Sequence, residues 1–361
     1  MCIVSNDKKI QMEDKQMKKL IALLLAVVMV FALAACANTA KTDTPAQDTP
    51  AETTKTDAPA ADDTQDAAPA EETPAAEDGK KLVFGATFMS QTNEHFLTIT
   101  EGLQAWCDAN GHELVVLDPN YDASIQMTEL EDFIEMGIDG LFISPVDGES
   151  IVPALEKVMA AGIPVIAIDA HPANEDDLDG LVSANNYMAG YQAGKALCEA
   201  IGGKGQVAFI DYYIKDYTVS QRDQGYYDAL AEYPDVELVY EEVAKGSADT
   251  ALPIAEDILT MYPDLAGFIC INDPTAQGAY AACEGAGRTD VKITSVDGSQ
   301  TNMGLIKEGK VVATASQRPY DLGVTAAEQM SKLLNGETIE HYIEIDTICI
   351  DASNVDEYYK G

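Results

Sequence analysis

The sequence predicts an α/β fold with two lobes, each a doubly wound parallel sheet covered by helices. Short apolar runs alternate with segments whose apolar residues are three or four positions apart, as in Phe96, Ile99 and Leu103. Strands that alternate with helices of this length are typical of βαβ units and of parallel sheets buried on both faces. Ten such strands divide into two sets of five around residues 184–205, which predicts the two lobes.

The predicted strands and helices follow one another along the chain. In doubly wound sheets, ligands bind beyond the carboxyl ends of the strands, so these ends are where a site is expected. The strands are the apolar runs at 81–87, 113–117, 140–143, 164–168 and 180–183, then at 206–210, 237–242, 267–271, 292–296 and 312–315. Helical spacing lies between most of them, for example at Ile151, Leu155, Val158 and Met159, and at Leu252, Ile254, Ile258 and Leu259.

Residues 1–35 have the pattern of a secretory signal peptide. Lys18 and Lys19 precede an apolar run at 20–34, and small residues end it. This order of charged, apolar and small segments is typical of signal peptides. The run has 15 residues, and a membrane-spanning helix needs roughly 20. We expect Met17 to be the functional start, because the residues before it are polar.

Cys36 follows this segment directly, in the order Leu-Ala-Ala-Cys. That ending resembles the lipobox of bacterial lipoproteins. The resemblance implies that Cys36 is lipidated and holds the chain at the extracytoplasmic face of the cell membrane. Residues 37–79 are nearly all Ala, Thr, Pro, Asp and Glu, with no aromatic or β-branched apolar residue. Such a segment buries too little surface to offset its ordering entropy, so we expect a disordered acidic linker over 36–79.

The predicted folded part, residues 80–361, is strongly acidic. Residues 1–36 contribute +2 and residues 37–79 contribute −9 to the formal net charge of −39, which leaves −32 for the rest. Such a surface repels phosphate backbones, which argues against nucleic acid as a partner. The cysteines form no Cys-x-x-Cys pair and no metal-like grouping with the four histidines, so we expect no metal and no cofactor. Cys270 lies in an apolar run and is interpreted as a buried thiol.

Polar side chains gather where the predicted strands end. Taken singly, each has a structural explanation: an N-cap for Asn93, a turn for Asp297, a surface ion pair for Arg222. Their joint placement in both lobes favours one site instead. Carboxylates and amides exchange hydrogen bonds with hydroxyl groups, and arginine donates as a rigid fork, which suits a small polyhydroxylated ligand. The candidate residues are Asn93, Phe96, Asp169, Arg222, Asn272, Asp297 and Gln317.

From about residue 81 to residue 354, the chain resembles the type I periplasmic binding proteins of the ribose- and galactose-binding kind, which feed ABC sugar transporters. The matching stretches are Asn93-Glu94-His95-Phe96, 143–147, 161–169, 185–190, 222–226, 271–273, 296–298 and 317–323. The resemblance implies sugar contacts from the seven candidates, with His95 at a further binding position. It also implies three hinge crossings, near 184–185, 317–318 and 345–346. The lobes are then 80–184 with 318–345, and 185–317 with 346–361.

Three positions depart from the family's pattern. Ala170 stands where ribose binders have an arginine, His95 stands where they have an aromatic residue, and Gly246 stands where a stacking aromatic is expected. One ionic donor is therefore missing, which argues against assuming ribose. One of the two aromatic side chains expected to stack on the faces of a sugar ring is therefore absent, or another aromatic residue supplies it. The four candidates are Tyr212, Tyr213, Tyr217 and Tyr320.

Residues and resemblance together predict a monomeric lipoprotein that binds a monosaccharide or small polyol by hinge closure and presents its closed form to an ABC permease. We expect no enzyme: the chain has no Gly-x-Ser-x-Gly motif. Asp169 and Asp297, a conceivable glycosidase pair, match binding positions. A sugar-responsive repressor would need DNA-binding helices where the signal peptide stands. Two alternatives stay open: presentation of the closed form to a chemoreceptor or sensor kinase, and the same fold binding a furanone signal, a nucleoside or an inositol.

Overall fold

A computed structural model describes residues 81–212 and 216–360. The predicted signal peptide, Cys36, the linker and Tyr213 lie outside these residues. Among the helices in the described part of the chain, none combines the length and the apolar composition that crossing a membrane requires.

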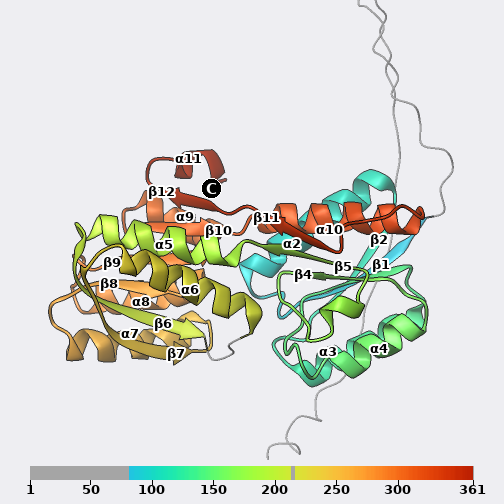
Figure 1. The fold of residues 1–361 in the computed structure, drawn as a ribbon, viewed down its shortest axis with the longest axis horizontal. Coiled ribbons are helices and arrows are strands. Elements are labelled where there is room, and N and C mark those ends of the chain that lie inside the picture. Colours follow the sequence, from blue (N-terminus) through green and yellow to red (C-terminus); the bar gives the residue numbers. More distant parts are fainter. Residues whose placement is uncertain (1–80, 213–215, 361) are drawn as a thin grey trace, which may run out of the picture. The chain divides into compact units, whose positions relative to one another are not determined.

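The first sheet has six strands in the order β11-β5-β4-β3-β1-β2, and every neighbouring pair is parallel (Figure 1). We call this sheet and its helices the first lobe. Its strands are β1 (Val83–Thr87), β2 (Glu113–Leu117), β3 (Gly140–Ile143), β4 (Val165–Ile168), β5 (Gly180–Ala184) and β11 (Tyr342–Ile345). Its helices are α2 (Glu94–Asn110), α3 (Ala123–Met136), α4 (Val152–Ala160), a 3₁₀ turn at Glu175–Asp177 and α10 (Pro319–Leu334).

The second sheet repeats this arrangement in the order β12-β10-β9-β8-β6-β7. We call this sheet and its helices the second lobe. All its pairs are parallel except that of β12 with β10. Its strands are β6 (Lys204–Tyr212), β7 (Asp235–Ala244), β8 (Leu265–Cys270), β9 (Lys292–Asp297), β10 (Ala313–Ser316) and β12 (Ile348–Asp351). Its helices are α5 (Asn186–Ala200), α6 (Tyr217–Ala231), α7 (Ala248–Met261), α8 (Asp273–Gly285), α9 (Gln300–Lys307) and α11 (Val355–Tyr358).

The predicted fold class is confirmed, because both lobes have the strand order of doubly wound sheets. All ten predicted strands form, with ends within two residues of those expected. The strands that the sequence did not predict are β11 and β12, each of four residues. Both are short and mostly only partly buried, so neither has a clear apolar run. The antiparallel pairing of β12 corrects the expectation of purely parallel sheets.

The chain passes between the lobes three times: after β5, after β10, and between β11 and β12. These passages coincide with the predicted hinges near 184–185, 317–318 and 345–346. The residues at which the lobes divide, and rotation about these passages, stay predictions.

Two helix pairs approach each other backbone to backbone, α10 with α2 and α5 with α6. A Cβ on Gly323 of α10 would lie 2.2 Å from the carbonyl oxygen of Ile99 in α2. A Cβ on Gly190 of α5 would lie 1.9 Å from that of Arg222 in α6. Atoms do not approach so closely, so these contacts need glycine. They fix α2 and α6, the helices that carry predicted site residues at or near their N-termini.

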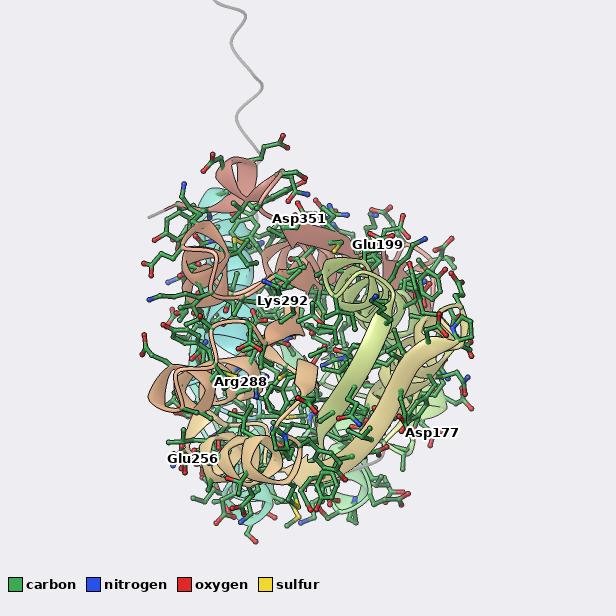
Figure 2. All side chains as sticks on the ribbon, turned by 90° about the vertical axis from the view of Figure 1, so that its left-hand side faces the viewer. Asp177, Glu199, Glu256, Arg288, Lys292 and Asp351 are labelled. Atoms are coloured by element: carbon green, nitrogen blue, oxygen red, sulfur yellow. The ribbon has the colours of Figure 1, made fainter. Side chains whose placement is uncertain are left out.

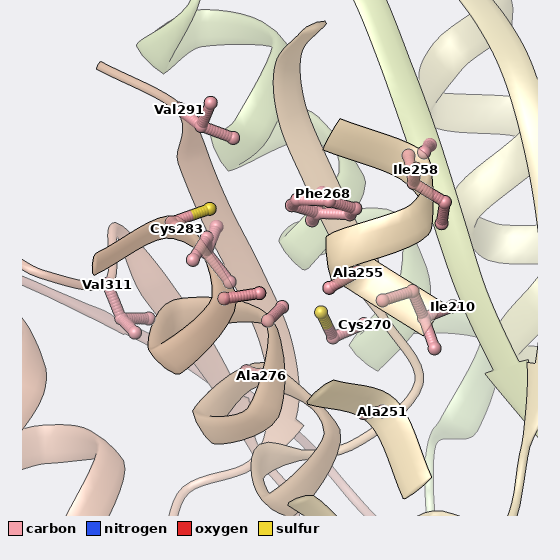
Figure 3. Close-up of a cluster of buried hydrophobic side chains, with 14 of the residues drawn as sticks. Ile210, Ala251, Ala255, Ile258, Phe268, Cys270, Ala276, Cys283, Val291 and Val311 are labelled. Carbon is pink, nitrogen blue, oxygen red and sulfur yellow. The ribbon is translucent and has the colours of Figure 1, made fainter. Parts of the chain in front are cut away.

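Figure 3 shows part of the core of the second lobe, between the sheet and helices α7 and α8. Phe268 and Cys270 of β8 pack with Ala255 and Ile258 of α7 and with Ala276 of α8. Cys270 is fully buried, and burial raises the pKa of its thiol well above the ordinary value. The interpretation of Cys270 as a buried apolar thiol is confirmed.

Charged side chains of both signs lie on the described surface. Figure 2 labels Glu199 and Glu256 on one face of the molecule, and both are exposed. The basic Arg288, also labelled there, is paired with Asp290 at 2.8 Å.

Candidate functional site

A cavity lies between the lobes, at the carboxyl ends of strands from both sheets. It contains about 630 Å³ of space free of protein atoms, part of it open to solvent. The structure brings all the predicted site residues of the folded part together here, while their role as ligand contacts stays a prediction. They are Asn93, His95, Phe96, Asp169, Arg222, Asn272, Asp297 and Gln317.

Asn93 and Asn272 are helix N-caps as well as cavity residues. Asn93 Oδ1 accepts from the backbone N–H of His95 at 3.0 Å, and its Nδ2 donates to Tyr121 Oη at 3.2 Å. Asn272 Oδ1 caps α8, and its Nδ2 donates to the carbonyl of Gly246 at 3.0 Å. The N-cap explanation of Asn93 is therefore confirmed, and its role as a ligand contact stays a prediction. Each amide is held in one orientation with one N–H remaining for a ligand.

Asp169 lies just after β4 with a φ of 70°, a region that residues other than glycine seldom adopt. Its Oδ1 accepts from Gln317 Nε2 at 3.0 Å and lies 3.5 Å from Nε2 of His95. Burial raises the pKa of Asp169, but His95, Arg222 and the Gln317 hydrogen bond outweigh it, so the net pKa is lowered. Backbone strain of this kind concentrates at functional sites, and here it holds a charged acceptor in the cavity wall.

His95 presents a polar ring to the cavity in place of an aromatic hydrocarbon. Its side chain is buried, and neither ring nitrogen has a hydrogen-bond partner, since the 3.5 Å contact with Asp169 is too long for a well-formed bond. Burial lowers the pKa of His95, but attraction to Asp169 outweighs this, so the net pKa is raised. A ligand hydroxyl next to His95 would satisfy a group that the protein leaves unpaired.

Arg222 of α6 is buried and is already partly bonded to the protein. Its Nη1 donates to the carbonyl of Ile271 at 2.7 Å, and its Nη2 donates to Asn186 Oδ1 at 2.8 Å. The Nε–H has no partner. The sequence predicted that Arg222 donates as a rigid fork. The structure shows that protein acceptors hold two of its nitrogens, and we predict that Nε–H and the second hydrogen of each terminal nitrogen donate to a ligand.

Asp297 ends β9 with a φ of 127° and is buried. Its Oδ2 accepts from the backbone N–H of Asp273 at 3.2 Å. Burial, together with the nearby carboxylate of Asp273, raises the pKa of Asp297 to about 7, although His95 and Arg222 act in the opposite direction. The ability of Asp297 to accept hydrogen bonds with both oxygens therefore changes near neutral pH.

Aromatic rings form part of the cavity wall. Phe96 is backed by Phe88, whose ring is stacked at 6.2 Å with an interplanar angle of 8°. A Cβ on Gly246 would lie 2.8 Å from the Tyr212 ring, so Tyr212 occupies the space that a side chain at position 246 would need. Of the four tyrosines considered from sequence, Tyr212 lines the cavity, Tyr217 and Tyr320 do not, and Tyr213 lies outside the described residues.

Sequence reasoning missed several lining residues, and part of the signal for them was present. Asp216, Thr218 and Val219 begin helix α6, where Asp216 accepts from the backbone N–H of Val219 at 2.8 Å. Arg222 was selected because it follows the end of a strand. The same reasoning would have selected Asp216, Thr218 and Val219 if the start of the helix had been placed at residue 217. The missed residues are Met89, Tyr121, Asp216, Thr218, Val219, Lys245 and Ile271.

A family model described as a periplasmic binding protein domain matches residues 84–338. The chain belongs to the periplasmic binding protein family. It is similar to the ribose import binding protein of Bacillus subtilis, with 26% identity over 264 residues, or 73% of this chain and 85% of the relative. It is also similar to the xylitol-binding protein of Mycolicibacterium smegmatis, with 29% identity over 236 residues, or 64% of this chain and 67% of the relative.

Among solved structures, this periplasmic binding protein resembles an ABC transporter solute binding protein from Actinobacillus succinogenes with bound D-allose. The TM-score is 0.73 at 28% identity, over 77% of this chain and 100% of that chain. Membership in the family makes the chain a binding protein and not an enzyme. In the described part of the chain, no three His, Cys, Asp or Glu side chains group as metal ligands.

Proposed function

We propose that this periplasmic binding protein captures a monosaccharide or small polyol between its lobes and delivers it to an ABC permease. The proposal rests on one observation: both lobes contribute fixed hydrogen-bonding groups to a single cavity. The named ligands of the similar proteins, ribose, xylitol and D-allose, are all small and polyhydroxylated. Groups on two lobes facing one cavity suit a ligand that carries hydroxyls around its whole periphery.

The chemistry of the cavity favours an uncharged ligand with several hydroxyls. Asp169 accepts, and the remaining N–H groups of Asn93, Asn272 and Arg222 donate. A hydroxyl both donates and accepts, so neighbouring hydroxyls can pair with both kinds of group. The negative charge of Asp169 is opposed by the positive charge of Arg222, so Asp169 does not by itself favour a cationic ligand.

Capture follows from the division of the site between the lobes. A ligand bonded to Asn93 and Asp169 on one lobe and to Arg222 and Asn272 on the other is bound fully only when the lobes are close together. Such a ligand has a higher affinity for the closed form and shifts the population toward it. We propose that the three passages between the lobes are the hinges and that the permease recognises the closed form.

The departures at the cavity wall set the specificity. Ala170 is buried beside Asp169 and leaves space where an arginine would extend. His95 adds a polar contact, and Tyr212 supplies the ring wall that Gly246 lacks. We therefore infer a ligand that differs from ribose in size or in the pattern of its hydroxyls.

We further propose that Cys36 is lipidated after signal peptide cleavage and that residues 37–79 tether a monomeric binding unit to the outer face of the cell membrane. Two acyl chains give stable anchoring where one gives only marginal binding. Intact-mass analysis of membrane-extracted protein should find a diacylated N-terminal Cys36, and light scattering should find a monomer. An unmodified chain that begins before Cys36 would contradict the anchor.

A thermal-shift screen of the purified protein against pentoses, hexoses, polyols, inositols and nucleosides tests the proposed function. A ligand at 100 times its Kd adds about 2.7 kcal/mol to the free energy of unfolding, which gives a clear rise in Tm. We expect a hit among monosaccharides or polyols, followed by a Kd from calorimetry. A folded protein that responds to no member of the panel, and from which no sugar co-purifies, would refute the proposal.

A further inference from the structure

Glu94 lies between the cavity residues Asn93 and His95 but contacts the opposite lobe. Glu94 is the first residue of α2, and its carboxylate reaches the N-terminus of α9 in the second lobe (both helices are labelled in Figure 1). Its Oε1 accepts from the backbone N–H of Gln300 at 2.5 Å, and its Oε2 accepts from Thr301 Oγ1 at 2.8 Å. The backbone N–H of Thr301 lies 3.4 Å from both carboxylate oxygens.

This contact completes the capping of α9. The first N–H groups of a helix have no partner within the helix, and the helix dipole favours a negative charge there. Ser299 Oγ accepts from the N–H of Asn302, which leaves the N–H groups of Gln300 and Thr301 for Glu94. The second lobe thus provides two donors that its own residues do not satisfy, and the first lobe provides the carboxylate.

The partner of Glu94 is held firmly in the second lobe. Gln300 Nε2 donates to the carbonyl of Tyr358 at 3.1 Å, and Gln300 Oε1 accepts from the N–H of Lys360 at 2.7 Å. On the other side of the contact, Asn93, His95 and Phe96 line the cavity. The hydrogen bonds of Glu94 therefore fix the distance between one wall of the cavity and the helix that follows Asp297.

We propose that Glu94 is a positioning residue that latches the lobes in the closed form by capping α9 across the interlobe gap. The inference rests on the proposed function, because it assumes that ligand is captured by closure. Hydrogen bonds are lost when their atoms separate by about an ångström, so the contact stabilises the arrangement described here over any in which the lobes move apart, and we take this arrangement as the closed form. Glu94 touches no ligand and acts through the position of the two lobes.

The latch predicts a particular kinetic effect. Ligand enters the open form, in which the contact is absent, so the association rate should change little when the contact is removed. Dissociation requires opening, so the dissociation rate should rise. Loss of a charge-assisted cap of this kind should make ligand affinity roughly 5- to 30-fold weaker.

A double-mutant cycle on the full chain tests the latch, with variants Glu94→Gln, Thr301→Val and both together. Thr301→Val is needed because Glu94 also lies in the first turn of α2, where an acidic residue favours that helix by itself. Glu101→Gln is the matched control: it removes the same charge about two turns later on α2, at an exposed position. The probes are D-ribose, D-allose, xylitol and myo-inositol, with stopped-flow rates, Kd by calorimetry and Tm without ligand.

We expect Glu94→Gln to raise the dissociation rate and the Kd, and Thr301→Val to raise both to a smaller degree. The Kd of the double variant should equal that of Glu94→Gln alone, because the two substitutions act on the same contact between the lobes. Glu101→Gln should leave the Kd within about twofold. The latch is overturned if Glu94→Gln lowers the Tm of ligand-free protein while the Kd stays unchanged, or if it behaves like Glu101→Gln. If none of the four probes binds, the hit from the thermal-shift panel serves as the probe; folded wild-type protein that responds to no member of that panel, and from which no sugar co-purifies, would refute the proposed function, and the latch with it.

Discussion

Replacement of Arg222 by alanine tests the site at a residue with well-defined contacts. The substitution removes the donors to the carbonyl of Ile271 and to Asn186 Oδ1, at 2.7 and 2.8 Å. Asn186 Oδ1 keeps a weaker donor, Gln317 Nε2 at 3.3 Å, whereas the Ile271 carbonyl loses the donor that Arg222 supplies. A buried acceptor left without its donor costs about 1–3 kcal/mol, so we expect the free energy of unfolding to fall by about 1–3 kcal/mol.

The loss of ligand affinity is a separate quantity. The Nε–H of Arg222 has no protein partner, and a hydrogen bond from a charged group contributes about 1.5–3 kcal/mol. The Kd should therefore rise about 10- to 150-fold. Arg222→Lys keeps the charge without the fork and should give intermediate values of both quantities. Urea unfolding and calorimetry on the same preparations separate them. A folded Arg222→Ala variant whose Kd stays within about twofold of wild type would refute the assignment of Arg222 to the site.

Three further predictions use other contacts of the site. Ligand affinity should rise as the pH increases from about 6 to about 8, because Asp297, whose pKa is about 7, becomes a full acceptor. As the pH rises from about 4 to about 7, the free energy of unfolding of the ligand-free protein should fall, because folded Asp297 keeps a proton that the unfolded chain releases. Measurements of Kd and Tm against pH, on wild type and on Asp297→Asn, test the two effects. Tyr212→Leu should weaken the binding of cyclic sugars by about 0.5–1.5 kcal/mol and that of open-chain xylitol less, as calorimetry will show. Gly190→Ala should lower stability and affinity together by about 1–3 kcal/mol, because its Cβ would lie 1.9 Å from the Arg222 carbonyl oxygen; urea unfolding and calorimetry measure this.

Each of these predictions has an outcome that contradicts it. An affinity independent of pH between about 6 and 8 would remove Asp297 from the ligand's hydrogen bonds. Equal losses for cyclic sugars and xylitol in Tyr212→Leu would exclude stacking. A Gly190→Ala variant with wild-type stability and Kd would mean that α5 and α6 can separate without moving Arg222.

The fold was predictable because buried parallel strands are continuous apolar runs, and ten of these stand out along the chain. The meeting of the candidate residues in one cavity was predictable because doubly wound sheets bring their strand ends together, so that residues as distant as Asn93 and Gln317 line it. The strands β11 and β12 were not predictable from pattern, since each has four residues and is mostly half-buried.

Other features of the site depend on contacts that no sequence pattern encodes. The anchoring of Arg222 by Ile271 and Asn186 depends on how α5 approaches α6. The pKa of Asp297 depends on a second carboxylate, Asp273, which hydrogen-bonds to Ser295 and Thr314. The packing of the Tyr212 ring against Gly246 could not be predicted, because it depends on how the backbone brings these two residues together. Gly246 leaves free the space that the ring fills.

The glycine contacts between helices have a mechanical consequence. The helices α5 and α10 each follow a passage between the lobes, and each is in backbone contact with a helix that carries a predicted ligand contact, α6 with Arg222 and α2 with Phe96. If ligand binds these side chains, a displacement of either one is transmitted through rigid helix contacts to the predicted hinges. Substitutions at these buried helix contacts can then change ligand affinity without changing any residue that lines the cavity.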